Sequence, residues 1–403
     1  KDGLSKEISS LKATGPYLNF ILNKNYLAEN VIKEVIKDSE NYGNNKGGKG
    51  AKIIVEFAHP NTHKAFHIGH LRNIITGESV ARILNNCGYK IIRANYQGDI
   101  GLHVAKCIWG VKNLAKEFKE ASKLELNKKA EFLGKAYALG SESYEKNAKV
   151  KMEIIILNKE IYNNEKGVKN IYKKTRKWSL DYFNKIYKRV CVNFDRMYFE
   201  SEVFKSGKEI VLKNLNKGIF EKSDGAIIFR GENYGLHNRV FINSEGNPTY
   251  EAKDLGLARL QLKEYNPKKI IHVVGPEQAE YFKVVFKAME FIMPNAKDKE
   301  THLSYGWVKL KKGKMSSRLG NVILGEWLLD EIKKEIFKLV KENKNIKNKE
   351  ETAKRISLAA VKYSILKCGL KNEIVFDIKE SINLSGNSGP YLLYTRARIN
   401  SII

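Results

Sequence analysis

Cysteine is scarce in this chain of 403 residues, which contains only Cys87, Cys107, Cys191 and Cys368. No two of them form a Cys-x-x-Cys pair. The sequence therefore argues against a disulfide framework and against a cysteine-based zinc site, and favours free thiols in a reducing, cytoplasmic setting. The chain also lacks an apolar run of the ~18 residues that a membrane-spanning helix needs, so we expect no membrane partner.

Other features are missing at the two ends of the chain. It has no initial methionine and no signal-peptide pattern, and it stops inside an apparent helix. We therefore expect a longer protein cut at both ends. The content of hydrophobic residues, 42%, is sufficient for a sizeable core, and the length predicts about two to three domains.

Negative charge is in short supply, because 45 acidic residues face 72 basic ones and leave a net charge of +27. Only 13 of the basic residues are arginine. Compositional drift in an AT-rich genome explains the excess of lysine about as well as a functional demand does. A pI near 9.6 still favours a polyanionic partner, because lysines that bind phosphates release counterions.

Strands and helices alternate along most of the chain. An apolar strand run at 53–57, a helical pattern at 68–84 and a second strand run at 90–95 predict a βαβ unit and a parallel sheet. The remaining expected elements are helices around 26–37, at 254–265 and at 277–293, strands at 225–231, 239–243, 269–274 and 304–310, a loop at 311–320, and helices alone beyond 326.

Residues 112–177 interrupt this alternation, with 17 basic and 9 acidic residues, helical periodicity and no strand run. We interpret the segment as a helical insertion. A solvated helix surface explains its lysines more simply than contact with RNA does, although both readings stay open.

The segment His67-Ile68-Gly69-His70 is the strongest chemical signal, because it follows a strand and a loop and opens a helix. A helix N-terminus binds phosphate through its free N–H groups and its dipole. Two imidazoles placed there can donate further hydrogen bonds, and Gly69 leaves room for a flat base. Two ordinary histidines are the alternative reading.

A second segment, Lys314-Met315-Ser316-Ser317-Arg318, lies between Gly313 and Gly320 after an expected strand. A lysine on such a loop can close over a triphosphate and stabilise the charge that develops on an attacked phosphate. By itself, the segment is also compatible with an ordinary lysine-rich turn.

Together and in this order, the two segments resemble the signature motifs of class I aminoacyl-tRNA synthetases. The flanking segments narrow the resemblance to arginyl-tRNA synthetase; they are VEFAHPNTHKAFHIGHLRN (55–73), NYQGDIGLH (95–103), VVGPEQAEYFK (273–283), GKMSSRLGNV (313–322) and GNSGPYLLYTRARINSI (386–402). They occur in the order of that family and span most of the chain.

The resemblance implies an α/β protein with a Rossmann-type parallel-sheet catalytic domain, a helical insertion and a C-terminal all-helical segment. The implied boundaries are a remnant of an N-terminal domain and a linker at 1–50, the catalytic domain at 51–111 and 190–325, the insertion at 112–189, and a helical region leading into a truncated anticodon-binding domain at 326–403. The implied activity is that of an arginine–tRNA ligase, with ATP, Mg²⁺ carried by ATP, L-arginine and tRNA(Arg) as partners and a cytoplasmic monomer as its form. No dedicated protein metal site is expected. In this family, the formation of the adenylate usually requires tRNA.

The resemblance also implies roles for individual residues. His67, His70, Lys64 and Lys314 would be catalytic and form a cationic clamp, and ATP would contact His67, Gly69, His70, Lys314, Met315 and Ser316. Two positions depart from the family pattern. Ser317 stands where most class I members have lysine, and Lys64 is expected to replace that lysine. Ala58-His59 stands where two small residues are usual.

Selectivity for arginine requires carboxylates, because a guanidinium pairs well with a planar, bidentate partner. The resemblance assigns substrate binding to Asn61, Tyr250, Asp254 and Gln278, with Glu56 near the charged groups of the substrate. From the residues alone, Asp254 could equally be a helix N-cap, and Glu56 could form a structural ion pair with Arg72.

Some features remain weaker. Asp99 and His103 follow the second strand, where an active-site wall or a capping aspartate would fall. Arg396 and Arg398 are candidate tRNA contacts or solvated arginines. Two further alternatives are a nucleotidylyltransferase that acts on a small molecule through the His-x-Gly-His motif, and a non-catalytic tRNA-binding relative.

Overall fold

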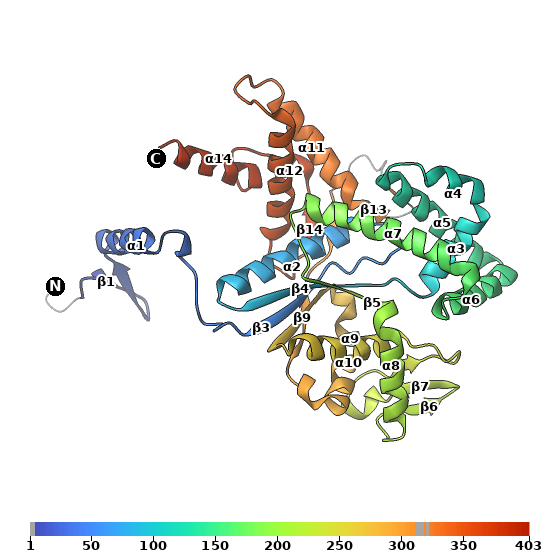
Figure 1. Cartoon of the computed structure of the whole chain (residues 1–403). Coiled ribbons are helices and arrows are strands. Elements are labelled where there is room, and N and C mark those ends of the chain that lie inside the picture. Colours follow the sequence, from blue (N-terminus) through green and yellow to red (C-terminus); the bar gives the residue numbers. More distant parts are fainter. Residues whose placement is uncertain (1–4, 312–317, 320–321, 403) are drawn as a thin grey trace. The chain divides into compact units, whose positions relative to one another are not determined.

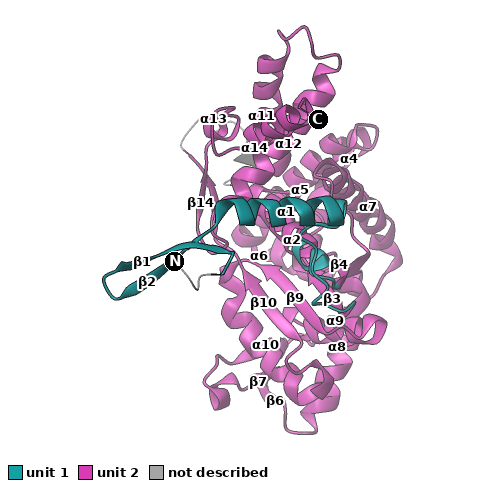
Figure 2. Cartoon of the chain, turned by 90° about the vertical axis from the view of Figure 1, so that its left-hand side faces the viewer, with its two compact units in different colours: residues 1–50, 83–89 teal, residues 51–82, 90–403 magenta. Residues whose placement is uncertain are grey.

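The computed structural model describes residues 5–311, 318–319 and 322–402. The chain divides into two compact units, coloured teal and magenta in Figure 2. The smaller unit comprises residues 1–50 and 83–89, and the larger unit comprises all other residues.

The smaller unit contains a β-hairpin and a helix. Strands β1 (Ile8–Thr14) and β2 (Tyr17–Leu22) pair antiparallel. Helix α1 (Lys24–Asp38) begins after Asn23, whose side chain accepts hydrogen bonds from two backbone N–H groups of the first turn. Helix α1 confirms the helix expected around 26–37. The hairpin was not predicted, because nearly all of its side chains are exposed and no alternating burial marks it as a strand pair.

The larger unit is built on a five-stranded parallel sheet in the order β10-β9-β3-β4-β5 (Figure 1). The strands are β3 (Lys52–Glu56), β4 (Lys90–Gln97), β5 (Arg196–Phe199), β9 (Lys269–Val274) and β10 (Glu300–Ser304). Helix α2 (Ile68–Asn86) connects β3 to β4, which confirms the predicted βαβ unit and the α/β class.

Helices cover both faces of this sheet (Figure 1). Helix α2 lies on one face, and helices α8 (Glu200–Leu215), α9 (Tyr250–Tyr265) and α10 (Ala279–Ile292) lie on the other. An apolar cluster forms between the sheet and these three helices, and its members include the fully buried Ile54 and Ile270. Because both faces are covered, the central strands are continuous apolar runs, which is why they could be recognised from the sequence.

The expected insertion at 112–189 falls within a run of consecutive helices: α3 (Leu102–Asn113), α4 (Ala115–Ala121), α5 (Leu126–Lys146), α6 (Ala148–Tyr162) and α7 (Lys166–Arg189). Two apolar clusters hold these helices together. Helices α3 and α5 approach so closely that a side chain on Gly140 would collide with the backbone of Lys106. The expected helical character of 112–177 is confirmed.

A small antiparallel sheet and a helical C-terminal region complete the unit. The small sheet contains β6 (Glu221–Ser223), β7 (Ala226–Phe229) and β8 (Arg239–Ile242). The C-terminal elements are β11 (Val308–Leu310), β12 (Arg318–Leu319), β13 (Val322–Ile323), α11 (Gly325–Val340), α12 (Lys349–Leu366), β14 (Ile374–Phe376), α13 (Ile378–Ser381) and α14 (Gly389–Asn400).

Three expectations about this region were wrong. Residues 304–310 do not form one strand, because β10 ends at Ser304 and the chain leaves the main sheet at Gly306, whose N–H donates to the carbonyl of Leu370. The region beyond 326 is not all helix, because β14 pairs with β11 in a two-stranded parallel sheet. Within the expected loop at 311–320, Arg318–Leu319 form β12, which pairs with β13, while residues 312–317 and 320 lie outside the described residues.

Candidate functional site

The loop that follows β3 lies at the carboxyl edge of the main sheet and is held in a strained conformation. Ala58, His59 and His63 all have positive φ angles, of 83°, 49° and 65°, which residues with a side chain rarely adopt. The loop is fixed from outside, since the Thr62 N–H donates to the Gly98 carbonyl at 2.9 Å. Such strain persists only where the surroundings impose it and is typical of functional sites.

His67 and His70 lie at the start of α2 and interact with its free N–H groups. The Gly69 N–H donates to Nδ1 of His67 and the His67 N–H donates to Nδ1 of His70, both at 3.1 Å. The ring centres are 3.7 Å apart. Because each Nδ1 accepts a hydrogen bond, each neutral ring carries its proton on Nε2 and can donate it to a ligand.

The imidazole pair is not cationic. Burial and the charge of Lys64 lower the pKa of His67 to about 4, and burial lowers the pKa of His70 well below its usual value. At neutral pH both rings are therefore uncharged donors, which corrects the expectation of a clamp in which the histidines carry positive charge. A side chain on Gly69 would lie 2.9 Å from two atoms of the His67 ring, so glycine is required there for the ring itself.

Lys64 is positioned by the helical insertion. Its Nζ lies 5.4 Å from the ring centre of Tyr137 on α5, a cation–π distance. Lys314, Met315, Ser316 and Ser317 lie outside the described residues. The sequence singled out two lysines for the phosphates, Lys64 and Lys314. Of these, Lys64 is the one within the described residues, and its charge acts on His67.

Glu56 ends β3 and is only 2% exposed. Its Oε1 is 2.9 Å from Nδ1 of His272 on the neighbouring strand β9, and Gln261 donates to its Oε2. Nε2 of His272 is 2.7 Å from Glu300 on β10. Although burial opposes its charge, the two carboxylates raise the pKa of His272 well above its usual value, so the imidazolium bridges them.

This arrangement rules out the proposed ion pair between Glu56 and Arg72. Arg72 instead donates to the backbone carbonyls of Leu370 and Asn372, at 3.0 and 3.1 Å. Its side chain therefore ties α2 to the C-terminal region.

Asp254 lies in α9, which begins at Tyr250 after the N-cap residue Thr249, so the N-cap interpretation of Asp254 is wrong. The hydroxyl of Tyr281 donates to its Oδ2 at 2.7 Å. Burial raises the pKa of Asp254 to about 8, with Glu56 adding to the rise and the Tyr281 hydrogen bond opposing it. Asp254 and Glu56 are thus close enough to interact electrostatically.

The remaining candidates occupy different parts of the chain. Gln278 follows β9 and is the N-cap residue of α10, and Tyr250 is exposed at the start of α9. Asn61 lies against Gly98 in the loop after β4. Arg396 and Arg398 are exposed on α14, and their contact with tRNA stays a prediction.

Asp99 and His103 both organise the loop after β4. Asp99 accepts hydrogen bonds from the N–H and hydroxyl of Ser201 at the start of α8 and pairs with Arg176 at 2.7 Å. His103 Nε2 is 3.2 Å from the carbonyl of Gly98. Asp99 therefore caps a helix, but one that begins about a hundred residues later in the chain, a distance that the sequence could not indicate.

The sequence reasoning missed several charged residues of this region: Glu200, Lys253, His272 and Glu300. His272 offered one signal, because it is a polar residue inside the apolar strand run KIIHVV. A polar side chain in a strand buried on both faces requires partners and therefore points to a buried network.

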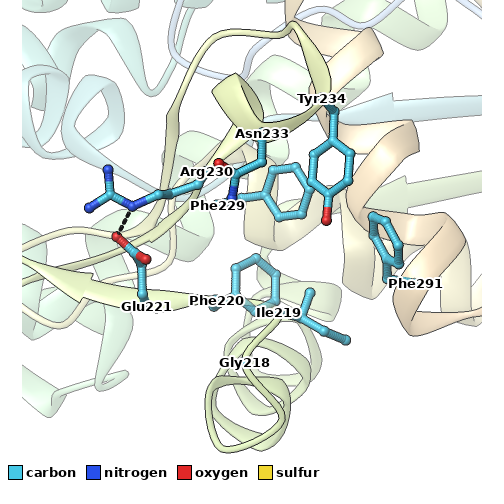
Figure 3. A pocket seen from close by; sticks show the side chains of 9 residues that line it. All are labelled: Gly218, Ile219, Phe220, Glu221, Phe229, Arg230, Asn233, Tyr234 and Phe291. Atoms are coloured by element: carbon cyan, nitrogen blue, oxygen red, sulfur yellow. Dashed lines mark ion pairs between the residues drawn. The ribbon is translucent and has the colours of Figure 1, made fainter.

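A pocket of about 110 Å³ lies elsewhere, between β6, β7 and the end of α10 (Figure 3). Its walls include the rings of Phe220, Phe229, Tyr234 and Phe291, with Arg230 and Glu221 paired at its rim. None of the candidate residues above lines it.

Among the described residues, no group of three or more His, Cys, Asp or Glu is arranged to hold a metal ion. Within the same part of the chain, no helix has the length and apolar character needed to cross a bilayer.

Comparison with known proteins gives a consistent result. The family description "tRNA synthetases class I (R), catalytic domain" matches residues 31–378. The arginine–tRNA ligase of Treponema denticola is 35% identical over 405 residues, covering 99% of this chain and 68% of the relative. That of Borreliella afzelii is 36% identical over 402 residues, covering 98% and 68%.

Solved structures agree in fold. Thermus thermophilus arginyl-tRNA synthetase aligns with a TM-score of 0.79 at 22% identity, covering 99% of this chain and 71% of that protein. The Plasmodium falciparum enzyme aligns with a TM-score of 0.75 at 22% identity, covering 99% and 68%. Because the family description matches most of the chain and the curated relatives align along nearly all of it, the chain belongs to the class I arginyl-tRNA synthetases.

Proposed function

We propose that this chain is an arginine–tRNA ligase, which activates L-arginine with ATP and transfers the arginyl group to the 3′ end of tRNA(Arg). Family membership supports the reaction. The structural observation that carries the proposal is the pair of neutral imidazoles at the N-terminus of α2, each with its Nε2 proton available. Such a helix start suits a nucleotide phosphate.

Activation joins a carboxylate to a phosphate. An α-carboxylate oxygen of arginine attacks the α-phosphorus of ATP, a new oxygen–phosphorus bond forms, and the bond to the bridging oxygen breaks as pyrophosphate leaves. His67 and His70 donate hydrogen bonds to phosphate oxygens, and the dipole of α2 favours the charge that develops there. Since both rings are neutral, positive charge comes from Lys64 and Lys314.

The transfer step takes place at the carboxyl carbon of arginine, which is the acyl carbon of the adenylate. A hydroxyl of the terminal ribose of tRNA attacks the acyl carbon of arginyl-adenylate, AMP leaves, and one proton is released. We assign no general base to this step, because the phosphate of the leaving AMP already makes the acyl group reactive.

Two carboxylates support selectivity for arginine. Asp254 is the better candidate partner for the guanidinium, because its second oxygen is available beside the one that accepts from Tyr281. Both oxygens of Glu56 are already engaged by His272 and Gln261, so we assign it an electrostatic role near the substrate. Asn61, Tyr250 and Gln278 complete the proposed arginine site.

The remaining assignments follow from this reaction. Mg²⁺ would be bound by the phosphates of ATP, as Mg²⁺ commonly is, without a dedicated protein cage. We place the protein in the cytoplasm, where its substrates are. We expect it to act as a monomer. The nucleotidylyltransferase and non-catalytic alternatives gain no support from the described residues.

An aminoacylation assay with each of the 20 amino acids and total tRNA tests the proposal. We expect arginine to be attached to tRNA and lysine not to be attached. Attachment of another amino acid, with no attachment of arginine, would refute the assignment. Pyrophosphate exchange should be measured with tRNA present.

The Lys64→Ala variant tests the proposed role of Lys64 on phosphate charge. It is expected to slow adenylate formation at least about tenfold while changing arginine binding little. Lys135→Ala is the matched control, because Lys135 lies on α5, the helix that carries Tyr137, but pairs with Glu117 on the surface. Equal losses in rate and in arginine binding for Lys64→Ala would contradict the role.

A further inference from the structure

Three helices meet at one buried aromatic ring, that of Phe66, which directly precedes the imidazole pair. Phe66 is only 1% exposed. Its ring centre lies 5.2 Å from that of His70 on α2 and 6.2 Å from that of Phe183 on α7. On α11, a side chain built on the first residue, Gly325, would lie 2.9 Å from two atoms of the same ring. Because packed interiors transmit strain, a displacement of α7 or α11 would reach the start of α2 through this ring.

Backbone contacts join the start of α11 to the same segment. The Gly325 N–H donates to the carbonyl of Phe66 at 3.0 Å. The preceding residue, Leu324, forms an antiparallel β-bridge with His67. The position of the His67 backbone therefore depends on where the first turn of α11 lies, although the two segments are far apart in the sequence.

Helix α7 holds the first turn of α11 through the carboxylate of Glu326. The hydroxyl of Tyr182 donates to its Oε2 at 2.9 Å, and Nζ of Lys185 donates to its Oε1 at 3.1 Å. Arg189, one turn further along α7, lies 3.9 Å from the same Oε1. Burial raises the pKa of Tyr182 and the charge of Glu326 adds to the rise, so the hydroxyl keeps its proton at neutral pH. Three donors on one face of α7 thus converge on one residue of α11.

Stability alone gives a weaker explanation of the contacts of Glu326. The side chain of Lys185 is 48% exposed, and ion pairs with exposed lysines contribute little to the free energy of unfolding. A purely structural role also predicts similar effects on every substrate when the carboxylate is removed. A positioning role at the start of α2 instead predicts effects on the substrate that binds there.

We propose that Glu326 is a positioning residue for the imidazole pair and links α7 to the start of α2. Its carboxylate sets where α11 begins, and the backbone of Leu324 and Gly325 carries that position to His67. This inference rests on the proposed function, in which His67 and His70 bind the phosphates of ATP. Helix α7 then takes part in the placement of the nucleotide without touching it.

Two variants of the full chain, Glu326→Ala and Tyr182→Phe, test the proposal. Each is assayed by pyrophosphate exchange in the presence of tRNA, with the Michaelis constants for ATP and arginine measured separately, together with ATP binding and thermal unfolding. Glu326→Ala is expected to raise the Michaelis constant for ATP and to lower the turnover number, each about tenfold, and to leave the Michaelis constant for arginine within about twofold.

Tyr182→Phe removes one hydroxyl and keeps the ring, so we expect changes of the same kind that are smaller, about threefold. This variant decides the question where Glu326→Ala does not fold. Glu331→Gln is the matched control, because Glu331 also lies on α11 but pairs with Lys334 of the same helix. It should behave as wild type.

Unchanged kinetics in both variants, or equal rises in the Michaelis constants for ATP and arginine, would overturn the inference while the proposed function stands. A wild-type chain that binds ATP but does not activate arginine would refute the proposed function alone. The inference is then decided by the dissociation constant for ATP, which Glu326→Ala is expected to raise about tenfold. A wild-type chain that does not bind ATP would refute both.

Discussion

Asp254 combines a buried carboxyl group, a hydrogen bond from Tyr281 and the nearby charge of Glu56, and its pKa of about 8 follows from burial. At pH 7 the carboxyl group of the free protein is therefore mostly protonated. A guanidinium binds the ionised form and lowers the pKa, so arginine binding should release up to one proton.

We therefore expect the affinity for arginine to rise by up to about tenfold per unit between pH 6 and pH 8 and to level off above. Calorimetry in two buffers of different ionisation enthalpy measures the released proton directly. Asp254→Asn, which cannot ionise, should bind weakly and without this pH dependence. An affinity that does not change with pH in the wild type would contradict the assignment of Asp254 to the guanidinium.

Individual residues of the site were predictable only where their partners are near in sequence. His67, Gly69 and His70 are within one helical turn, and their placement at the start of α2 could be foreseen from the strand and loop before them. His272 bridges Glu56 and Glu300, which are 216 and 28 residues away, and no local pattern indicates such partners. The predicted pairing of Arg72 with Glu56 was wrong for a similar reason, because the acceptors of Arg72 are 298 and 300 residues away in the sequence.

Helices α3 and α5 illustrate a constraint at the level of whole elements. A methyl group on Gly140 would lie 1.9 Å from the carbonyl oxygen of Lys106, and one on Gly110 would lie 2.0 Å from that of Ala136. The two glycines thus permit a close approach of the helices that no other residue would allow.

Gly140→Ala is expected to lower the free energy of unfolding by about 1–3 kcal/mol, because the helices must separate. Gly167→Ala is the matched control in α7, since a methyl group there meets no atom within 4 Å and alanine favours a helix by up to about 1 kcal/mol. Urea unfolding measures both. A Gly140→Ala variant as stable as Gly167→Ala would show that the helices move apart at no cost.

Elements could be predicted from the sequence where burial leaves a periodic pattern. The central strands and the long amphipathic helices meet this condition, whereas β1, β2 and β14 do not, because they are short or exposed and form two-stranded sheets. The separation of β10 from β11 depends on contacts with residues 370–372, which a local pattern cannot reveal.

The net charge of +27 is a property of the whole molecule and bears on the binding of tRNA. Four lysines of the helical insertion, Lys128, Lys135, Lys146 and Lys177, each pair with an acidic residue of the same region. For these four lysines, the pairs favour the solvated interpretation over RNA contact. Residues 112–177 still hold 17 basic residues against 9 acidic ones, so an excess of positive charge remains on the insertion.

Salt dependence of tRNA binding separates these contributions. Because lysines that neutralise phosphates release counterions, the association constant should fall at least about tenfold between 50 and 200 mM salt, while arginine binding changes little. Lys135→Gln combined with Lys146→Gln should leave the slope of log K against log salt unchanged, because each lysine already has an acidic partner. A slope reduced by about two in this double variant would instead assign both lysines to phosphate contacts, and it would make the insertion part of the tRNA-binding surface.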